Sequence, residues 1–161
     1  SSKGRDRCPD ARHYQTMTLD DIIDLPVGDL AADDCMLFLW VTDWMTPATQ
    51  DQLLTAWGFT YKTVAFYWTK CKPSGAEHVG TGYYTRANPE QCLLATKGHP
   101  KRLSRSVRKW IHAPVREHSR KPDETYERIE QLVAGPYLEL FSRTNRPGWT
   151  SWGDQSGMFG G

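Results

Sequence analysis

The sequence predicts an α/β domain, and three stretches of the chain carry that prediction. Residues 35–41 form a continuous apolar run that does not alternate, which predicts a strand buried on both faces at the centre of a parallel sheet. Residues 35–68 follow the order strand, helix, strand with short links, which predicts a βαβ crossover. Residues 119–155 predict a loop, a helix, a buried strand and a polar loop, in that order.

Length and composition limit the class of protein. The chain has 161 residues, which is enough for one domain with a single core. Its four cysteines are far apart without a C-x-x-C pair, which favours reduced thiols over disulfides or a zinc site. No apolar run is long enough to span a bilayer, and the amino-terminal residues show no signal-peptide pattern. We therefore expect a cytoplasmic protein without a bound metal.

The first predicted helix begins after a polar segment. Residues 1–13 are polar and contain glycine and proline, so we expect a loop. Thr18 is a predicted N-cap, acidic residues follow it in the first turn, and Pro26 is expected to end the helix. Residues 26–34 are predicted to form a polar turn that leads into the strand at residues 35–41.

The second predicted helix connects two strands. Thr46 and Pro47 are an N-cap and a first-turn proline, and Gly58 is the expected end of the helix. Residues 63–68 are rich in β-branched and aromatic side chains and predict the next strand. Together with residues 35–41 they make the predicted crossover.

The carboxyl-terminal half predicts three more strands and one helix. Residues 91–96 are an apolar strand, and residues 110–113 are a short edge strand that ends before a proline. A helix is expected from Pro122 to Gly135, with acidic residues in its first turn. Residues 137–141 are the last predicted strand.

A long loop, residues 71–89, is expected between two of the strands. Loops of this length in compact domains are usually functional or disordered. Its glycines allow close backbone approach, and Tyr83, Tyr84 and Arg86 are candidates for contact with nucleic-acid bases. Ordinary aromatic packing within the loop is the equal alternative.

Positive charge is concentrated in residues 97–121, although the net charge of the chain is only +1. The basic residues there are opposed only by Glu117, which gives a local field suited to a polyanion. The alternative is a solvated loop. The candidates for nucleic-acid contact in this segment are Lys101, Arg102, Arg105 and Arg108.

Short strings along the chain, in one order and spacing, carry a resemblance to a known family. They are Tyr14–Met17, Leu37–Thr42, Trp57–Phe59, Gly80–Tyr84, Cys92–Leu94, Lys97–Pro100, Lys121–Glu124, Glu139–Arg143 and Gly153–Gln155. Together they closely resemble the N6-adenine methyltransferase family that includes the catalytic subunit of the messenger-RNA adenosine methyltransferase. The similarity covers roughly residues 10–157 and is nearest to short bacterial and phage members.

This resemblance implies a Rossmann-like sheet flanked by helices that binds S-adenosylmethionine and methylates the exocyclic N6 amine of adenine. Similarity to the short prokaryotic members favours DNA as substrate, in a prokaryotic cell or a phage-infected host. RNA is an alternative substrate. A catalytically inactive nucleic-acid-binding or scaffolding module is the alternative of a different class. The sequence gives no indication of the oligomeric state.

The resemblance also implies which residues hold the methyl donor: Ser119, Lys121, Glu139, Phe141, Arg143, Asn145, Asp154 and Gln155. Tyr14 would lie beside the target base. A ribose diol needs a carboxylate or an amide, which Glu139 and Asn145 supply, and most of these residues follow a strand, where such sheets bind ligands. Lys121 and Arg143 add hydrogen-bond donors, unless they are ordinary surface cations or pair with Glu139.

Two departures from the family pattern affect these expectations. Asp154 stands where the family usually has asparagine, and an aspartate lacks the amide's donor hydrogens. The family's catalytic Asp-Pro-Pro-Trp quartet is not among the 161 residues, and a central amino-terminal strand would be missing with it. We expect residues 1–161 to be a single methyltransferase-like domain from a longer protein, with a catalytically inactive remnant as the alternative.

Overall fold

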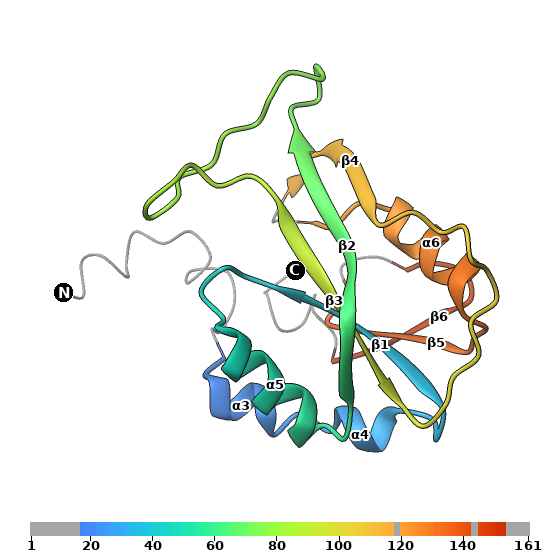
Figure 1. Cartoon of the computed structure of the whole chain (residues 1–161). Coiled ribbons are helices and arrows are strands. Elements are labelled where there is room, and N and C mark those ends of the chain that lie inside the picture. Colours follow the sequence, from blue (N-terminus) through green and yellow to red (C-terminus); the bar gives the residue numbers. More distant parts are fainter. Residues whose placement is uncertain (1–16, 118–119, 143–144, 154–161) are drawn as a thin grey trace. The chain divides into compact units, whose positions relative to one another are not determined.

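The structure is a computed structural model that describes residues 17–117, 120–142 and 145–153, and the chain clusters into two compact units (Figure 1). The first unit, residues 1–25 and 135–161, contains α3 (Leu19–Ile23), β5 (Tyr137–Leu140) and β6 (Trp149–Trp152). The second unit, residues 26–134, contains α4 (Val27–Leu30), β1 (Cys35–Val41), α5 (Pro47–Ala56), β2 (Thr60–Cys71), β3 (Glu90–Lys97), β4 (Trp110–Pro114) and α6 (Glu124–Leu132). The helices and strands confirm a mixed α/β protein.

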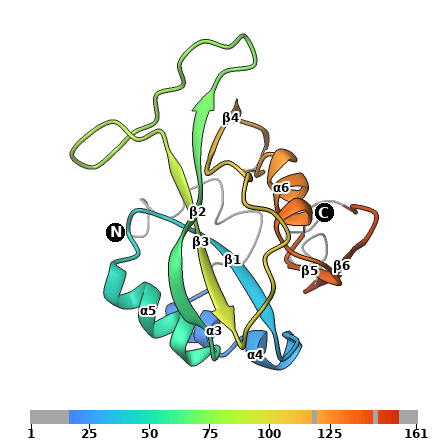
Figure 2. The ribbon, with the colours of Figure 1, turned by 45° about the vertical axis from the view of Figure 1, so that its right-hand side comes forward.

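The second unit is built on a four-stranded sheet in the order β1-β3-β2-β4 (Figures 1 and 2). Strand β3 is antiparallel to β1 and β2, and β4 is parallel to β2, so β1, β2 and β4 all run in one direction. The carboxyl ends of these three strands therefore lie at one end of the sheet, where β3 begins. We call this the carboxyl end, and the opposite end, where Lys97 pairs with Cys35, the amino end.

The predicted crossover is confirmed in direction but not in adjacency. Strands β1 and β2 run parallel and α5 connects them, yet β3 lies between the two strands. The helix begins as predicted, because the Thr46 hydroxyl accepts a hydrogen bond from the Thr49 backbone N–H at 3.3 Å. Leu53 and Leu54 are fully buried, and the helix packs against β2. The chain segment between β1 and β2, which contains α5, therefore passes the antiparallel strand β3 that lies between them.

The prediction that residues 35–41 form a central parallel strand is wrong for the described part of the chain. There β1 pairs only with β3, and the pairing is antiparallel. Its side chains are largely covered: Phe38 stacks on Phe66 with ring centroids 6.1 Å apart, and Trp40 meets Trp68 edge-on at 6.3 Å. A continuous apolar run indicates that both faces of a strand are buried. It does not indicate whether the strand's hydrogen-bonded neighbours are parallel or antiparallel.

The expected turn at residues 26–34 is wrong in part, because it contains α4. Val27 is buried at 5% exposure, and the Gly28 carbonyl accepts a hydrogen bond from the Lys97 ammonium at 3.0 Å. A helix of four residues is too short to show an amphipathic period, so its pattern was indistinguishable from a turn.

In the first unit, α3 begins as predicted and ends three residues before Pro26. Thr18 and Asp21 form a capping box, with Thr18 Oγ1 accepting from the Asp21 N–H at 3.1 Å and the Asp21 carboxylate accepting from the Thr18 N–H at 3.2 Å. The sequence did not predict β6, which pairs with β5 in parallel. A stack of Trp149 on Tyr137, with centroids 5.0 Å apart, joins these strands.

The remaining elements confirm the predictions with shifted ends. Strand β2 extends the predicted residues 63–68 at both ends, and β3 extends residues 91–96 by one residue at each end. Strand β4 lies at the sheet edge as expected, and α6 follows Pro122. The fully buried large side chains are Trp68, Phe66, Leu53, Leu54, Leu93, Ile111 and Cys92, so the core of the second unit lies on the sheet and under α5.

Candidate functional site

Three loops of the second unit meet the carboxyl end of the sheet. Residues 42–46 follow β1, residues 72–89 follow β2, and residues 115–123 follow β4. The long loop projects beyond the strands in both ribbon views (Figures 1 and 2). α/β sheets bind ligands at the loops that follow the carboxyl ends of their parallel strands, so the candidate site lies at this end.

A charged cluster occupies this end, and we call Lys70, Glu90 and Lys121 the Lys–Glu–Lys cluster. The Glu90 carboxylate accepts from the Lys121 ammonium at 2.5 Å and pairs with the Lys70 ammonium at 2.9 Å. The three side chains are mostly covered, at 30% exposure for Lys121, 20% for Lys70 and 19% for Glu90. Charges this sheltered interact more strongly than exposed pairs, because water screens them less.

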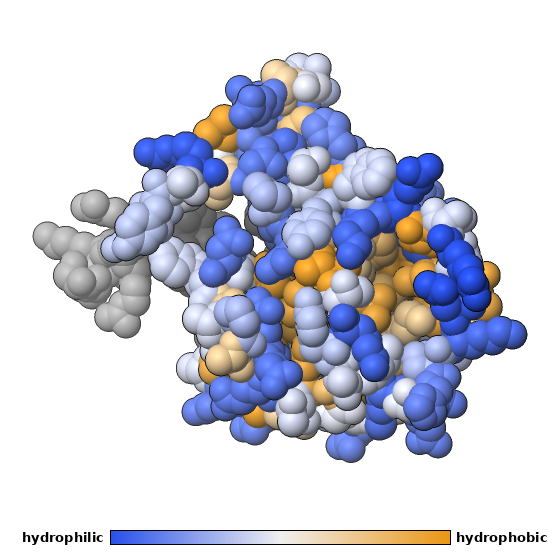
Figure 3. Space-filling view, viewed as in Figure 1, coloured by the Kyte–Doolittle hydropathy of each residue, from blue (hydrophilic) through white to orange (hydrophobic). Residues whose placement is uncertain are grey.

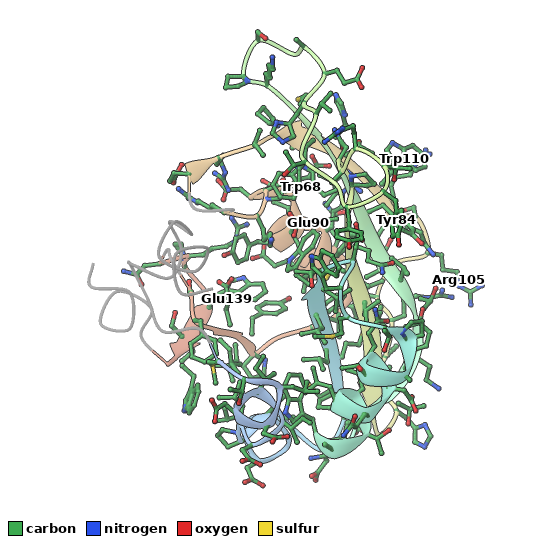
Figure 4. All side chains as sticks on the ribbon, turned by 90° about the vertical axis from the view of Figure 1, so that its left-hand side faces the viewer. Trp68, Tyr84, Glu90, Arg105, Trp110 and Glu139 are labelled. Atoms are coloured by element: carbon green, nitrogen blue, oxygen red, sulfur yellow. The ribbon has the colours of Figure 1, made fainter. Side chains whose placement is uncertain are left out.

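Two tryptophans lie beneath the cluster. The Lys121 ammonium is 5.3 Å from the centroid of the Trp40 ring and 5.9 Å from that of Trp68, and the Lys70 ammonium is 5.2 Å from that of Trp68. Both lysines are thus within range of cation–π attraction. Trp68 is fully buried and its indole N–H donates to the Ala113 carbonyl at 2.9 Å, so the ring is held in place. Figure 4 shows Trp68 and Glu90 next to each other on the sheet.

Strand register brings these residues to one face. Trp68 is directly opposite Glu90, and Trp40 is directly opposite Cys92, so the four side chains share a face of the sheet. Lys70 lies two residues after Trp68 and points the same way. The pattern Trp-x-Lys at the end of β2 and Glu-x-Cys at the start of β3 therefore supplies one part of the site, and Trp40 of β1 and the Lys121 loop supply the rest.

The loop that carries Lys121 is tied down at both ends. The Val115 N–H donates to the Cys71 carbonyl at 2.9 Å, which fixes the loop to the carboxyl end of β2. The Arg116 guanidinium donates to the backbone carbonyl of Lys121 and pairs with the Asp123 carboxylate at 3.0 Å. Arg116 thus holds the segment that presents the Lys121 ammonium to Glu90.

Asn88 fixes the other approach to the cluster. Its side-chain oxygen accepts from the Lys70 N–H at 2.8 Å, and its amide donates to the carbonyls of Lys70 at 2.9 Å and His78 at 2.5 Å. One side chain therefore satisfies three backbone groups. Asn88 therefore joins the base of the long loop to Lys70 of β2, which is one of the two lysines of the cluster.

The Glu90 carboxyl is charged at neutral pH. Burial alone would raise its pKa, but the hydrogen bonds and positive charges of Lys121 and Lys70 outweigh burial and lower the pKa below its ordinary value. Directly beside it on the strand face, burial raises the pKa of the Cys92 thiol. Cys92 is therefore a neutral core side chain and no nucleophile at neutral pH.

The cluster combines acceptors and donors in a half-sheltered setting. Lys121 has three N–H donors, of which the structure assigns one to Glu90, and its side chain stays 30% exposed. It can therefore meet a ligand carboxylate or a ring nitrogen while it remains paired. The three residues of the cluster include no nucleophile, so the cluster suits binding and orientation rather than covalent catalysis. Elsewhere at this end, the Thr69 hydroxyl lies 3.0 Å from Nδ1 of His112.

The first unit contains three of the residues predicted to bind the methyl donor. Glu139 is half-buried on β5, opposite Ser151 of β6, and Asn145 is exposed in the loop between the strands. Phe141 has a positive φ of 58°, and its ring lies 2.7 Å from the position that a Cβ on Gly153 would take. Only glycine fits at residue 153, so the backbone there is held tightly against the Phe141 ring.

The predicted donor-site residues are described only in part, and the described ones belong to both units. Tyr14, Ser119, Arg143, Asp154 and Gln155 lie outside the described residues. Lys121 belongs to the second unit, whereas Glu139, Phe141 and Asn145 belong to the first. The roles of these residues stay predictions.

The nucleic-acid candidates separate into two groups. Tyr83, Tyr84 and Arg86 are exposed in the loop at the carboxyl end. The second group starts from the amino end, where β3 closes, and runs back to β4: Lys101, Arg102, Arg105 and Arg108. The Arg105 side chain points outward in Figure 4. At about 3.3 Å per residue, β3 puts roughly 25 Å between the two ends. The second group begins at the amino end but runs back along the sheet, since the carbonyl of Lys109, next to Arg108, accepts from the Tyr67 N–H of β2 at 3.0 Å.

The expectation that Glu117 alone opposes the basic segment is wrong. Lys121 pairs with Glu90, Arg116 pairs with Asp123, and Arg120 pairs with both Glu117 and Asp123. These partners come from outside the segment or from its flank, so a count along the sequence missed them. The residues of the cluster that sequence reasoning missed are Lys70 and Glu90, together with Asn88 and Arg116 that position it. The available signal in the sequence was a lysine near the end of one predicted strand, Lys70, and a glutamate just before the start of the next, Glu90.

Within the described ranges, no three His, Cys, Asp or Glu side chains gather as ligands of a metal ion would. None of the helices in those ranges has the length and apolar character that a membrane crossing requires.

Comparison with known proteins identifies the family. The MT-A70 family model matches residues 2–155, and the chain therefore belongs to this family of N6-adenine methyltransferases. The chain is 36% identical over 145 residues to the Type II methyltransferase M.MunI of Mycoplasma sp., which covers 87% of this chain and 58% of the relative. It is also 34% identical over 148 residues to the human N(6)-adenosine-methyltransferase catalytic subunit METTL3, covering 88% of this chain and 25% of the relative.

A similar match, 36% over 148 residues, joins it to the N(6)-adenosine-methyltransferase MT-A70-like protein of Drosophila melanogaster, covering 88% of this chain and 24% of the relative. The chain thus spans little more than half of the bacterial relative and about a quarter of the animal ones. The resemblance inferred from the short strings is confirmed.

MT-A70 methyltransferases use S-adenosylmethionine as methyl donor. The charged residues at the carboxyl end fit such a molecule, because it carries a carboxylate, an amino group and a sulfonium. The Lys121 ammonium can pair with the ligand carboxylate, and Glu90 can accept from an amino group.

Proposed function

We propose that the protein is a methyltransferase that transfers the methyl group of S-adenosylmethionine to the N6 amine of adenine in DNA, on a Rossmann-like fold. The observation that carries this proposal is the Lys–Glu–Lys cluster over Trp40 and Trp68 at the carboxyl end of the sheet, in a chain of the MT-A70 family. Similarity to a bacterial Type II methyltransferase favours DNA over RNA and a cytoplasmic location.

In this proposal the cluster positions polar groups of the donor or of the target adenine. The donor, when bound, supplies an electrophilic methyl group. Glu90, charged at neutral pH, accepts a hydrogen bond from an amine, and Lys121 donates to an acceptor on the same ligand. Lys70 helps to keep the Glu90 carboxylate in place while Lys121, still paired with Glu90, meets the ligand. Such positioning lowers the barrier by fixing the direction of approach.

The family resemblance gives further residues proposed roles in binding the donor. Glu139 and Asn145 would hold the ribose, and Arg143, Asp154 and Gln155 would hold the remaining polar groups. Phe141 would lie against the donor's flat ring, and Ser119 on the Lys121 loop would add a hydroxyl. Tyr14 would contact the target base. The support for these roles is the family resemblance and the chemistry of the side chains.

For nucleic-acid binding, we propose that two surfaces act differently. Lys101, Arg102, Arg105 and Arg108 would contact phosphates, which gives affinity without sequence choice. Tyr83, Tyr84 and Arg86 would lie near the bases, because their loop belongs to the carboxyl end. The single-domain organisation of residues 1–161, and a catalytic quartet supplied by a longer protein, stay predictions that the coding sequence upstream of Ser1 tests.

The test is a methyl-transfer assay with the full-length protein, S-adenosylmethionine and matched DNA and RNA oligonucleotides. The products are digested to nucleosides, and N6-methylated adenine is measured by mass spectrometry. The proposal expects methylation of the DNA and little of the RNA. Methylation of RNA alone would support the RNA alternative, which the adenosine-methyltransferase names of the animal relatives favour. Absence of methylation on both, with retained nucleic-acid binding, would support an inactive binding module.

A further inference from the structure

Three large aromatic side chains project from the carboxyl end of the sheet. Trp44 is 74% exposed, Tyr83 is 77% exposed and Tyr84 is 93% exposed. Their rings touch in series, with centroids 5.5 Å apart for Trp44 and Tyr83 and 4.9 Å apart for Tyr83 and Tyr84, both edge-on. We call these three residues the aromatic platform. Edge-on contacts hold rings together while leaving ring faces open to a ligand.

The platform is held in shape by its own loop. Gly80 and Ala87 exchange two backbone hydrogen bonds, of 2.7 and 3.2 Å, and so close a small hairpin with the tyrosines at its tip. A Cβ on Gly82 would lie 1.5 Å from the Thr85 carbonyl oxygen, so only glycine permits this turn. Asn88 then fastens the hairpin base to Lys70 and His78. The tyrosines are therefore presented on a fastened loop.

The platform and the Lys–Glu–Lys cluster belong to the same end of the same unit. Trp44 lies in the loop after β1, and the tyrosines lie in the loop after β2. Asn88 hydrogen-bonds to the backbone of Lys70, whose ammonium pairs with Glu90. One side chain thus connects the hairpin that carries the tyrosines to the charged cluster. A strand whose adenine reaches the cluster would pass this hairpin.

The surroundings of the platform favour a nucleic-acid strand over a protein surface. Lys72 and Arg86 are exposed in the same loop and can meet phosphates. The loop also exposes one carboxylate, Glu77, and one large aliphatic side chain, Val79. In Figure 3 the projecting loop shows side chains of intermediate hydropathy among strongly hydrophilic ones. Protein interfaces are usually depleted of lysine and have an apolar core. Cations beside open aromatic faces are the pattern of single-stranded nucleic-acid binding.

We propose that Trp44, Tyr83 and Tyr84 stack on an unpaired base that flanks the methylated adenine. The inference rests on the proposed function and adds to it the recognition of a locally opened strand. A base within a duplex is covered on both faces by its neighbours. Stacking on a protein ring therefore requires a base with an uncovered face, such as the base next to a flipped nucleotide. Stacking on a ring face does not read the edge of a base, so the platform favours opened strands and not a particular sequence.

The experiment uses the full-length protein and single-stranded DNA with one adenine and 2-aminopurine at the neighbouring position. The fluorescence of 2-aminopurine falls when the base stacks. Tyr84→Leu and the double change Trp44→Leu with Tyr84→Leu remove rings but keep apolar side chains. Tyr84→Phe keeps the ring, and Tyr61→Leu removes a 42% exposed tyrosine at the amino end as matched control.

The expected result is quenching by the unaltered protein, and DNA binding at least about fivefold weaker for Tyr84→Leu and for the double variant of Trp44 and Tyr84. Tyr84→Phe and Tyr61→Leu should bind as the unaltered protein does. Leucine variants with unchanged affinity and quenching, alongside continued N6 methylation, would overturn the platform and leave the proposed function standing. If the unaltered protein neither binds nor methylates the strand, both fail. If the Trp44 and Tyr84 leucine changes alter only the oligomeric state of the protein in solution, the platform is a protein–protein contact and the inference is overturned.

Discussion

The two ends of the four-stranded sheet carry charged side chains in opposite physical settings. At the carboxyl end, Lys70, Glu90 and Lys121 are 19% to 30% exposed and paired with one another over two tryptophans. In the segment that leaves the amino end, Lys101, Arg102 and Arg105 are exposed and make no ion pair with any residue that the structure describes. The sheltered, paired charges can orient a ligand, whereas the open ones can only attract a polyanion.

The largest effect that separates the two ends should come from Glu90→Gln. The change keeps the shape but leaves two ammonium groups without their carboxylate. We expect the free energy of unfolding to fall by about 1–3 kcal/mol. Methyl transfer should slow at least about tenfold, which corresponds to ~1.4 kcal/mol of barrier. Urea unfolding and the methyl-transfer assay measure the two.

Glu127→Gln is the matched control for this change, because Glu127 is exposed on α6 away from the cluster. It should alter the unfolding free energy by less than about 0.5 kcal/mol. A Glu90→Gln protein with unaltered stability and rate would show that the cluster has no role.

The next effect concerns how the carboxyl end is held. Asn88→Ala should lower the unfolding free energy by about 1–3 kcal/mol, because it leaves the backbone groups of Lys70 and the His78 carbonyl without their side-chain partner. Gln52→Ala, an exposed change on α5, is the control. Urea unfolding measures the unfolding free energy of both variants. If Asn88→Ala unfolds at the same urea concentration as Gln52→Ala, the positioning role of Asn88 is contradicted.

Changes at the amino-end segment should leave the site intact and affect only affinity for nucleic acid. Replacing Arg102, Arg105 and Arg108 together by alanine should weaken DNA binding. The slope of log affinity against log salt should fall by about 0.9 for each phosphate that the variant no longer neutralises. Titrations at several salt concentrations measure the slope. A slope equal to that of the unaltered protein would exclude these arginines from the DNA interface.

The smallest effect is the pH dependence of stability. The folded-state pKa of Glu90 is lowered, so its stabilising contribution is present above the unfolded carboxyl pKa, near ~4.3. That contribution is lost as the pH falls through the folded-state pKa. The difference in urea midpoint between the unaltered protein and Glu90→Gln should therefore shrink in acid, below about pH 4. A difference that stays constant down to about pH 3 would contradict the charged state assigned to Glu90.

The sequence predicted the strands of the second unit because their side chains alternate or cluster in ways that reflect burial. It did not predict the order of the strands, because an apolar run such as residues 35–41 is compatible with either direction of pairing. Strand β6 was missed because its four residues are stabilised by ring contacts with β5, such as Trp149 on Tyr137, which no local pattern reveals.

The same limit applies to the candidate site. Lys121 was found through the family resemblance, whereas Glu90 is 31 residues away in the chain and meets it only after the sheet forms. Lys70 and Glu90 face each other because Trp68 and Glu90 are in register across β2 and β3. Charge counted along the sequence therefore overstated the positive field near Lys121, because part of that charge is neutralised by Glu90.

We propose that the carboxyl end of the sheet, through Lys121, binds the methyl donor. Calorimetric titration of the full-length protein with S-adenosylmethionine tests it most directly, with Lys121→Met compared with Lys101→Met. We expect one-to-one binding that weakens at least about tenfold, or ~1.4 kcal/mol, in Lys121→Met and is unchanged in Lys101→Met. Equal affinity of the two variants would contradict the claim.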